Sequence, residues 1–144
     1  MTISPTLAAY ARWYEAIAPE RLDEARALLA PDIRFKDPWN DVRGVDAFLR
    51  IHARMFAQVR NPRFAVLHIV QDGQVGYLRW RFDFSDRRGR RASSVEGMTE
   101  IHLDARDRIA QHIDHFDVAG QIYERVPVLG AVLRAIRRRV ADRG

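Results

Sequence analysis

The densest group of residues that could carry chemistry lies near the end of the chain, between His112 and Asp117. Two histidines and two aspartates stand there close together, and imidazole and carboxylate groups are common zinc ligands. The surrounding sequence indicates a strand, in which successive side chains point to opposite faces. His112, Asp114 and Phe116 would share one face, and His115 and Asp117 the other. Neither face then offers enough ligands, so we expect no metal.

His112 and Asp114 are two residues apart on one predicted face. Such a pair could form a hydrogen bond and share a proton, which is a workable acid/base arrangement near neutral pH. The alternative is a polar pair without a chemical role, whose hydrogen-bonding groups are satisfied at the solvated edge of the domain.

Three further polar residues stand where apolar side chains prevail. Asp37 precedes Pro38 at the end of a predicted strand, where the residue before proline favours extended backbone. A partly buried carboxylate there could act as a general base, or Asp37 could only cap its own turn. Tyr14 and His52 each lie on the apolar stripe of a predicted helix. There a hydroxyl or an imidazole could face a ligand or only fill the core.

The composition limits the classes of protein to consider. The chain has 144 residues, enough for one domain with a substantial core. It contains no cysteine, which excludes disulfides, thiol catalysis and cysteine-ligated zinc and fits a reducing compartment. We therefore expect a cytoplasmic protein. The apolar runs are too short to span a bilayer, and the first residues do not resemble a signal peptide.

The net charge is +5, and Lys36 is the only lysine among the cations. The arginines gather in two clusters, at residues 87–91 and 134–143. Basic clusters can bind nucleic acid or anionic lipid. They also occur on solvated turns and helix faces. We prefer the second interpretation and expect no nucleic-acid partner.

Helical spacing dominates the first part of the chain. Ser4 and Pro5 provide a cap and a first-turn proline, and Gly44 precedes the stripe that contains His52. We expect helices over residues 5–18, 22–29 and 45–59, with a short strand at 33–35 and a turn at 37–40.

After residue 62 the hydrophobic period changes from helical to alternating, and Asp72-Gly73 marks a hairpin turn. A helix group on a curved meander is an α+β domain, whose apolar interior suits small molecules. A basic amphipathic helix is predicted as a C-terminal appendage to a single domain that spans residues 1–144. The predicted strands are 64–71, 75–84, 92–103 and 108–118; the domain core is about 5–118, and the appended helix about 129–141.

Several local motifs accompany this order of elements: Phe35 to Asn40, Val42 to Gly44, Ile101 to Asp104, and His112 to Asp117. With them, residues 7–118 resemble the nuclear transport factor two-like superfamily, which includes SnoaL-like polyketide cyclases and ketosteroid isomerases. The resemblance implies a cone of three N-terminal helices packed in a strongly curved, mostly antiparallel sheet. It does not specify a reaction, because the superfamily also holds non-enzymatic modules.

The resemblance to ketosteroid isomerases implies roles for particular residues. An aspartate in a similar turn is their general base, and a tyrosine of the first helix donates to the enolate oxygen. These roles fall on Asp37 and Tyr14, with His52 in a supporting position. Thr99 stands where the isomerases carry a second carboxylic donor. A hydroxyl donates less strongly, which counts against steroid isomerisation.

The same resemblance sets which face of the last strand lies inside. An aromatic residue at the position of Phe116 faces the cavity in the isomerases, which would place His112 and Asp114 inside too. SnoaL-like cyclases also use an aspartate of the late strands. The residues expected to contact substrate are Trp39, His52, Trp80, Thr99 and Phe116.

We therefore expect a small-molecule enzyme or binder, without cofactor or metal, for an apolar ligand that bears a carbonyl. Asp37 would move the proton, Tyr14 would polarise the oxygen, and His112 with Asp114 would assist. One alternative is epoxide hydrolase-like or polyketide cyclase-like chemistry centred on Asp114. Another is a non-catalytic dimeric binding module, in which the cavity residues are only core.

Two expectations concern partners. The convex face of the sheet, with Met98, Ile113 and His115, predicts a two-fold homodimer. The appended helix is expected to close the cavity mouth or to dock on a partner subunit. Contact with an anionic membrane surface is the less favoured alternative.

Overall fold

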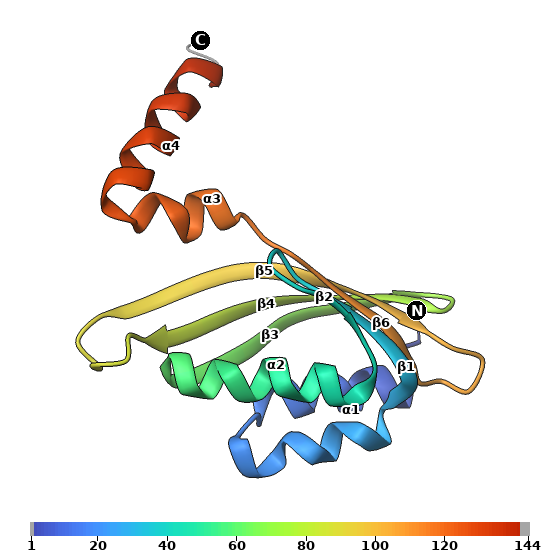
Figure 1. Ribbon diagram of the computed structural model, residues 1–144. Coiled ribbons are helices and arrows are strands. Elements are labelled where there is room, and N and C mark those ends of the chain that lie inside the picture. Colours follow the sequence, from blue (N-terminus) through green and yellow to red (C-terminus); the bar gives the residue numbers. More distant parts are fainter. Residues whose placement is uncertain (1, 142–144) are drawn as a thin grey trace.

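The first helix, α1 (Pro5–Glu15), begins at its predicted cap. The Ser4 hydroxyl oxygen accepts a hydrogen bond from the backbone N–H of Leu7 at 3.0 Å. Tyr10 and Tyr14, one turn apart, are buried on this helix. The helix lies beneath the sheet (Figure 1). The structure is a computed structural model that describes residues 2–141.

The second helical segment differs from the prediction. It is a 3-10 helix, η1 (Pro19–Ala27), and strand β1 (Leu29–Lys36) follows at once. The predicted helix 22–29 therefore began too late and ended too far along the chain, and the predicted strand 33–35 was too short. Leu29 pairs in parallel with Ile109, whose N–H donates to the carbonyl of Leu28 at 2.9 Å. This long-range pairing outweighs the helical pattern of the local sequence.

A tight hairpin connects β1 to the short strand β2 (Asp41–Arg43). Gly44 then turns the chain with a positive φ of 95°, a conformation that glycine adopts without the strain of a side chain. Helix α2 (Val45–Gln58) follows and buries Phe48, Leu49 and His52. The predicted helix at 45–59 is confirmed.

The remaining strands form a meander, as predicted, but the complete sheet is mixed. Its order is β2-β1-β6-β5-β4-β3, and β1 lies parallel to β6. The predicted last strand was too long, because Asp117 leaves the sheet to cap helix α3 (Val118–Gln121), accepting from Gly120 N–H at 2.8 Å. The strands are β3 (Arg60–Asp72), β4 (Val75–Ser85), β5 (Ala92–Leu103) and β6 (Ile109–His115).

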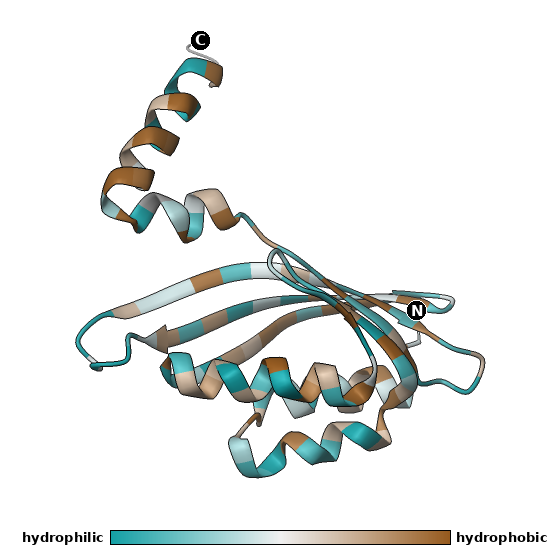
Figure 2. Ribbon diagram, viewed as in Figure 1, coloured by the Kyte–Doolittle hydropathy of each residue, from teal (hydrophilic) through white to brown (hydrophobic). Residues whose placement is uncertain are grey.

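The sheet curves over α1 and α2, which lie against its concave face (Figure 1). Figure 2 shows apolar and polar residues alternating along the strands, as expected for a sheet with one buried face. Leu78 and Trp80 of β4 and Ile101 of β5 are buried beneath this curve. The architecture is the predicted α+β cone.

The chain ends in the 3-10 turn η2 (Tyr123–Arg125) and helix α4 (Pro127–Val140), which confirms the appended helix. Figure 1 shows α4 standing away from the sheet and from α1 and α2. Over residues 2–141, no helix is both long and apolar enough to cross a membrane. Arg143, part of the basic cluster, lies outside the described residues.

Candidate active site

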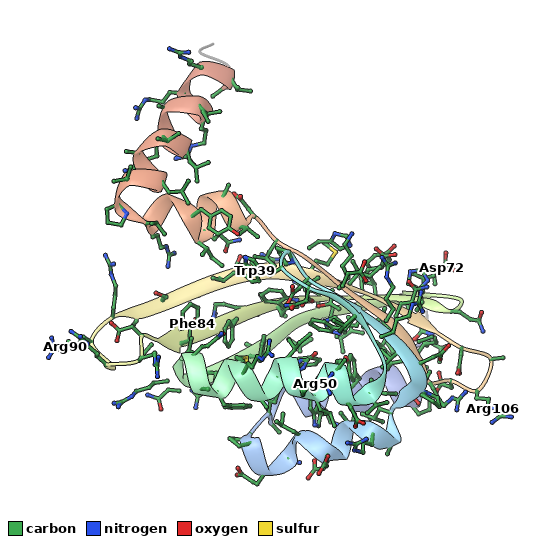
Figure 3. The ribbon with its side chains drawn as sticks, in the orientation of Figure 1. Trp39, Arg50, Asp72, Phe84, Arg90 and Arg106 are labelled. Atoms are coloured by element: carbon green, nitrogen blue, oxygen red, sulfur yellow. The ribbon has the colours of Figure 1, made fainter. Side chains whose placement is uncertain are left out.

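A cavity of about 470 Å³ lies between the concave face of the sheet and helices α1 and α2. Its walls are mainly aromatic: Phe64 and Phe82 stack with ring centroids 4.4 Å apart, and Phe84 continues the stack at 4.9 Å. Figure 3 shows Phe84 and Trp39 on this part of the molecule. Every residue predicted for the site lines the cavity: Tyr14, Asp37, Trp39, His52, Trp80, Thr99, His112, Asp114 and Phe116.

Asp114 occupies the inner part of this cavity and is held through one oxygen. Its Oδ1 accepts hydrogen bonds from the Thr99 hydroxyl at 2.5 Å and from His112 Nε2 at 2.9 Å. Thr99 in turn accepts a bond from the indole N–H of Trp80 at 2.8 Å. Within residues 2–141, nothing bonds to Oδ2, which therefore remains accessible from the cavity.

The surroundings of Asp114 keep its carboxyl group ionised. Its side chain is only 17% exposed, and burial alone would raise its pKa. The charge of His112 and the hydrogen bonds from His112 and Thr99 outweigh burial and lower the pKa below its ordinary value. The site thus presents a negatively charged oxygen to a largely apolar cavity.

A second set of hydrogen bonds extends from His112 into the core between α1 and α2. His112 Nδ1 lies 2.8 Å from the Tyr10 hydroxyl, which lies 3.5 Å from the Tyr14 hydroxyl. Tyr14 is 2.8 Å from His52 Nε2, and His52 Nδ1 is 2.8 Å from the carbonyl oxygen of Phe48. Asp114 is thereby connected to α2 through a continuous row of buried polar groups.

The directions of these bonds follow from the groups at the end of the row. A carbonyl oxygen only accepts, so His52 Nδ1 carries a hydrogen. Burial lowers the His52 pKa to about 4, so Nε2 is unprotonated and accepts a hydrogen bond from the Tyr14 hydroxyl. The hydroxyl hydrogen of Tyr14 is therefore committed to His52. This contact agrees with the predicted supporting position of His52.

His112 can carry one proton or two within this row. When the only ring hydrogen of His112 is on Nε2, its Nδ1 accepts a hydrogen bond from the Tyr10 hydroxyl. When both ring nitrogens carry a hydrogen, Nδ1 donates to the Tyr10 oxygen. The Tyr10 hydroxyl can then rotate and donate its own hydrogen to the Tyr14 oxygen. Burial raises the pKa of both tyrosines well above the ordinary value, so each stays a neutral hydroxyl that can donate or accept. The row accommodates either state without moving a ring.

Asp37 lies at the cavity rim and is tied to its own turn. Its Oδ1 accepts from the backbone N–H groups of Trp39 at 2.8 Å and of Asn40 at 2.7 Å. The Asn40 side-chain amide lies 3.0 Å from each Asp37 oxygen. These contacts match the turn-capping alternative, although the half-buried side chain also reaches the cavity.

The aromatic residues predicted to contact substrate form the mouth and one wall. The Trp39 indole N–H donates to the Tyr123 hydroxyl at 2.8 Å, and its ring is 5.8 Å from Phe116. Trp80 lies opposite Gly97 on the neighbouring strand, where a Cβ atom would come within 2.6 Å of the indole. Only a glycine there leaves room for the indole.

Sequence reasoning missed three residues of the site. Tyr10 was not singled out in the sequence, although its spacing from Tyr14, one helical turn, was the available signal. Arg54 and Gln58, one turn apart on α2, line the cavity with exposed side chains. Among the described residues neither has a hydrogen-bond or ion-pair partner, so both are donors open to a ligand.

Solved structures of the same fold are numerous, although comparison with curated proteins finds no match. An NTF2-like protein of unknown function from Burkholderia pseudomallei is 20% identical, with a TM-score of 0.72, over 83% of this chain and 96% of that chain. A protein from Jannaschia, assigned to the SnoaL-like polyketide cyclases, is 15% identical, with a TM-score of 0.69. The match covers 83% of this chain and 93% of that chain. An LEH-like epoxide hydrolase from M. tuberculosis is 17% identical, with a TM-score of 0.66. The match covers 91% of this chain and 89% of that chain.

Identities this low establish the fold alone. The family is shown by the sequence itself, because the model of the SnoaL-like domain matches residues 10–112, which is most of the chain. The match runs from α1 to β6 and includes most of the cavity-lining residues. The protein therefore belongs to the SnoaL-like domain family.

Proposed function

We propose that this protein is a cofactor-independent acid/base enzyme that removes a proton from the carbon next to a carbonyl of a mostly apolar small molecule. The observation that carries the proposal is the Asp114 carboxylate, which is held through Oδ1 and presents Oδ2 to the cavity. A fixed, ionised base in a largely apolar cavity is the arrangement that such proton transfer needs.

The reaction begins when Asp114 Oδ2 takes the proton of the C–H bond. The electron pair of that bond moves to the carbonyl oxygen and forms an enolate. In an isomerisation, Asp114 returns the proton to a different carbon. In a cyclisation, the enolate carbon attacks a second carbonyl of the same molecule, and the proton goes to the new alkoxide. Both outcomes balance without an added reagent.

Arg54 and Gln58 supply the polar end of the proposed binding mode. They are the cavity-lining donors that lack a partner in residues 2–141, and both stand on the exposed side of α2. The proposal places a substrate oxygen against them and the apolar body among Phe64, Phe82 and Phe84. A cavity of about 470 Å³ is within the usual range for small-molecule sites.

The proposal moves the base from Asp37 to Asp114 because of their different hydrogen bonds. Both Asp37 oxygens accept bonds within its turn, whereas Asp114 keeps one oxygen open. Tyr14, expected to polarise the substrate, gives its hydrogen to His52 in this arrangement. It therefore serves as part of the row behind His112.

A matched pair of variants tests the assignment. Proton transfer can be followed without knowing the natural substrate, as deuterium uptake into a panel of cyclic ketones in heavy water, measured by NMR. Asp114→Asn keeps size and removes the base, and should lower exchange by roughly two to four orders of magnitude. Asp37→Asn should leave exchange within a few-fold. A loss of exchange in Asp37→Asn but not in Asp114→Asn would mean that Asp37 is the base. If wild-type protein bound these ketones without exchange, the binding-module alternative would replace the proposal.

A second candidate, epoxide hydrolysis, uses the same carboxylate. Asp114 with His112 is equally suited to remove a proton from water, and the fold is shared with the LEH-like epoxide hydrolase. Diol formation from styrene oxide, lost in Asp114→Asn and accompanied by no ketone exchange, would favour this candidate over the first.

The homodimer stays a prediction, with support from the convex face of the sheet. Val70 pairs with Tyr77 across β3 and β4, and Met98 lies on the same face of β5. All three side chains are more than a third exposed in the single chain. Light scattering that gives the 16.7 kDa mass of one chain would contradict the dimer.

A further inference from the structure

Helix α4 leaves an apolar face uncovered. Its exposed large side chains are 43% to 81% accessible, more than any comparable stretch of the described chain presents. Figure 2 shows hydrophobic, brown segments recurring along the ribbon of this helix. From residue 129 onward they recur every three or four residues, so they form one stripe along the helix. The stripe consists of Val128, Leu129, Val132, Ile136 and Val140.

The charged residues of this helix are all arginines. By helical spacing, Arg137 lies beside the stripe, and Arg139, two turns after Val132, lies at its edge. Arg134 and Arg138 lie on the opposite side of the helix. No acidic residue occurs between Pro127 and Ala141, so the helix carries a large part of the net charge of +5. Long side chains beside an apolar stripe can lie along it and extend their charged ends to a polar boundary.

The position of the helix allows it to meet a flat surface. Its first turn is fixed to η2, where Gly130 is buried, and the rest projects beyond the body of the cone (Figure 1). No α4 residue lines the cavity, so within one chain the helix does not close the mouth as expected. Its 14 residues are too few to cross a bilayer.

These features favour one occupant of the stripe. Nucleic acid would match the arginines but leave the aliphatic side chains in water. A second α4 would cover the stripe but bring like charges together. An anionic membrane surface satisfies both, because acyl chains meet the stripe and lipid phosphates meet the arginines.

We propose that α4 is an interfacial helix that binds the surface of anionic phospholipid membranes. The stripe lies at the boundary between headgroups and acyl chains, and the arginines contact phosphate groups. This inference is independent of the reaction in the cavity.

Vesicle sedimentation with the full chain tests it. The vesicles are phosphatidylcholine alone, or phosphatidylcholine mixed with phosphatidylglycerol. Wild-type protein should bind the anionic vesicles at least about tenfold more tightly, and added salt should weaken the binding. Val132→Asp should lower the affinity about tenfold or more, and the double variant Arg138→Gln, Arg139→Gln severalfold. Ala53→Asp, which adds the same charge at an exposed position of α2 outside the cavity lining, should stay within about twofold of wild type.

Circular dichroism establishes that each variant is folded, and the arginine variant tests the idea without touching the apolar stripe. Equal binding by wild type and Val132→Asp would overturn the proposal. So would a failure to sediment with anionic vesicles, whether or not the protein binds an oligonucleotide. Sedimentation velocity without lipid provides the last check: self-association that Val132→Asp abolishes would mean that a second copy covers the stripe.

Discussion

Removing the imidazole at position 52 should change how stability depends on pH. His52 is 5% exposed, donates through Nδ1 to the Phe48 carbonyl and accepts from Tyr14 through Nε2. Burial disfavours its charged form and lowers its pKa from 6.5 to about 4. The unfolded chain therefore takes up a proton near pH 6.5, whereas the native protein does so only near pH 4. Stability is lost as the pH falls between these values.

The size of the effect follows from the difference between the two pKa values. At about 1.4 kcal/mol per pKa unit, the shift from 6.5 to about 4 corresponds to roughly 3 kcal/mol of unfolding free energy. This contribution is complete above pH 6.5, declines toward pH 4 and then levels off. Acidic groups also titrate in this range, but they do so in wild type and variant alike.

The assay is urea denaturation of wild type and His52→Gln at several pH values from 7 to 4. Glutamine can donate and accept but does not titrate, so the wild-type advantage should shrink by about 3 kcal/mol on acidification. His68→Gln, which removes an exposed histidine of β3, is the control that should not change the curve. A difference between wild type and His52→Gln that is constant over this range would refute the reasoning.

Three further variants test other parts of the structure. Gly97→Ala would place a Cβ atom 2.6 Å from Trp80 and should cost roughly 1–3 kcal/mol of unfolding free energy; an unchanged urea midpoint would mean that the indole has room to move. Ser4→Ala removes the cap of α1 and should cost about 1 kcal/mol, so an unaltered melting temperature would argue against the cap. Tyr10→Phe removes the hydroxyl beside His112 Nδ1, and should both cost roughly 1–3 kcal/mol and shift the pH profile of ketone exchange; stability loss with an unshifted profile would leave Tyr10 a purely structural role.

Elements that local signals define were predicted well. The bounds of β5 were predicted correctly at both ends, because charged turns with clear breakers flank a long alternating run. Helix α2 was located by Gly44 and by a continuous apolar stripe. The predicted face of β6 is also confirmed, since His112, Asp114 and Phe116 all line the cavity. That prediction relied on a resemblance, because alternation alone does not say which face lies inside.

Features that depend on distant pairing were not predictable in the same way. The bond between Thr99 and Asp114 requires the register of β5 against β6, which a bulge near Leu103 helps to set. No local pattern reveals that register. The early start of β1 has the same origin, since only its partner in β6 makes Leu29 part of a strand.

The parallel pairing of β1 with β6 has a consequence for the folding reaction. It joins Phe35 to His112, residues that are far apart in the sequence, and closes the cone beside Asp114. Contacts of such long range carry a high loop-closure entropy and tend to form slowly and late. The meander β3–β6 consists of short hairpin connections and is expected to form first. Recovery of the carboxylate site after dilution from denaturant should therefore trail recovery of the sheet, and a chain arrested before this closure would hold most of its strands but no assembled base.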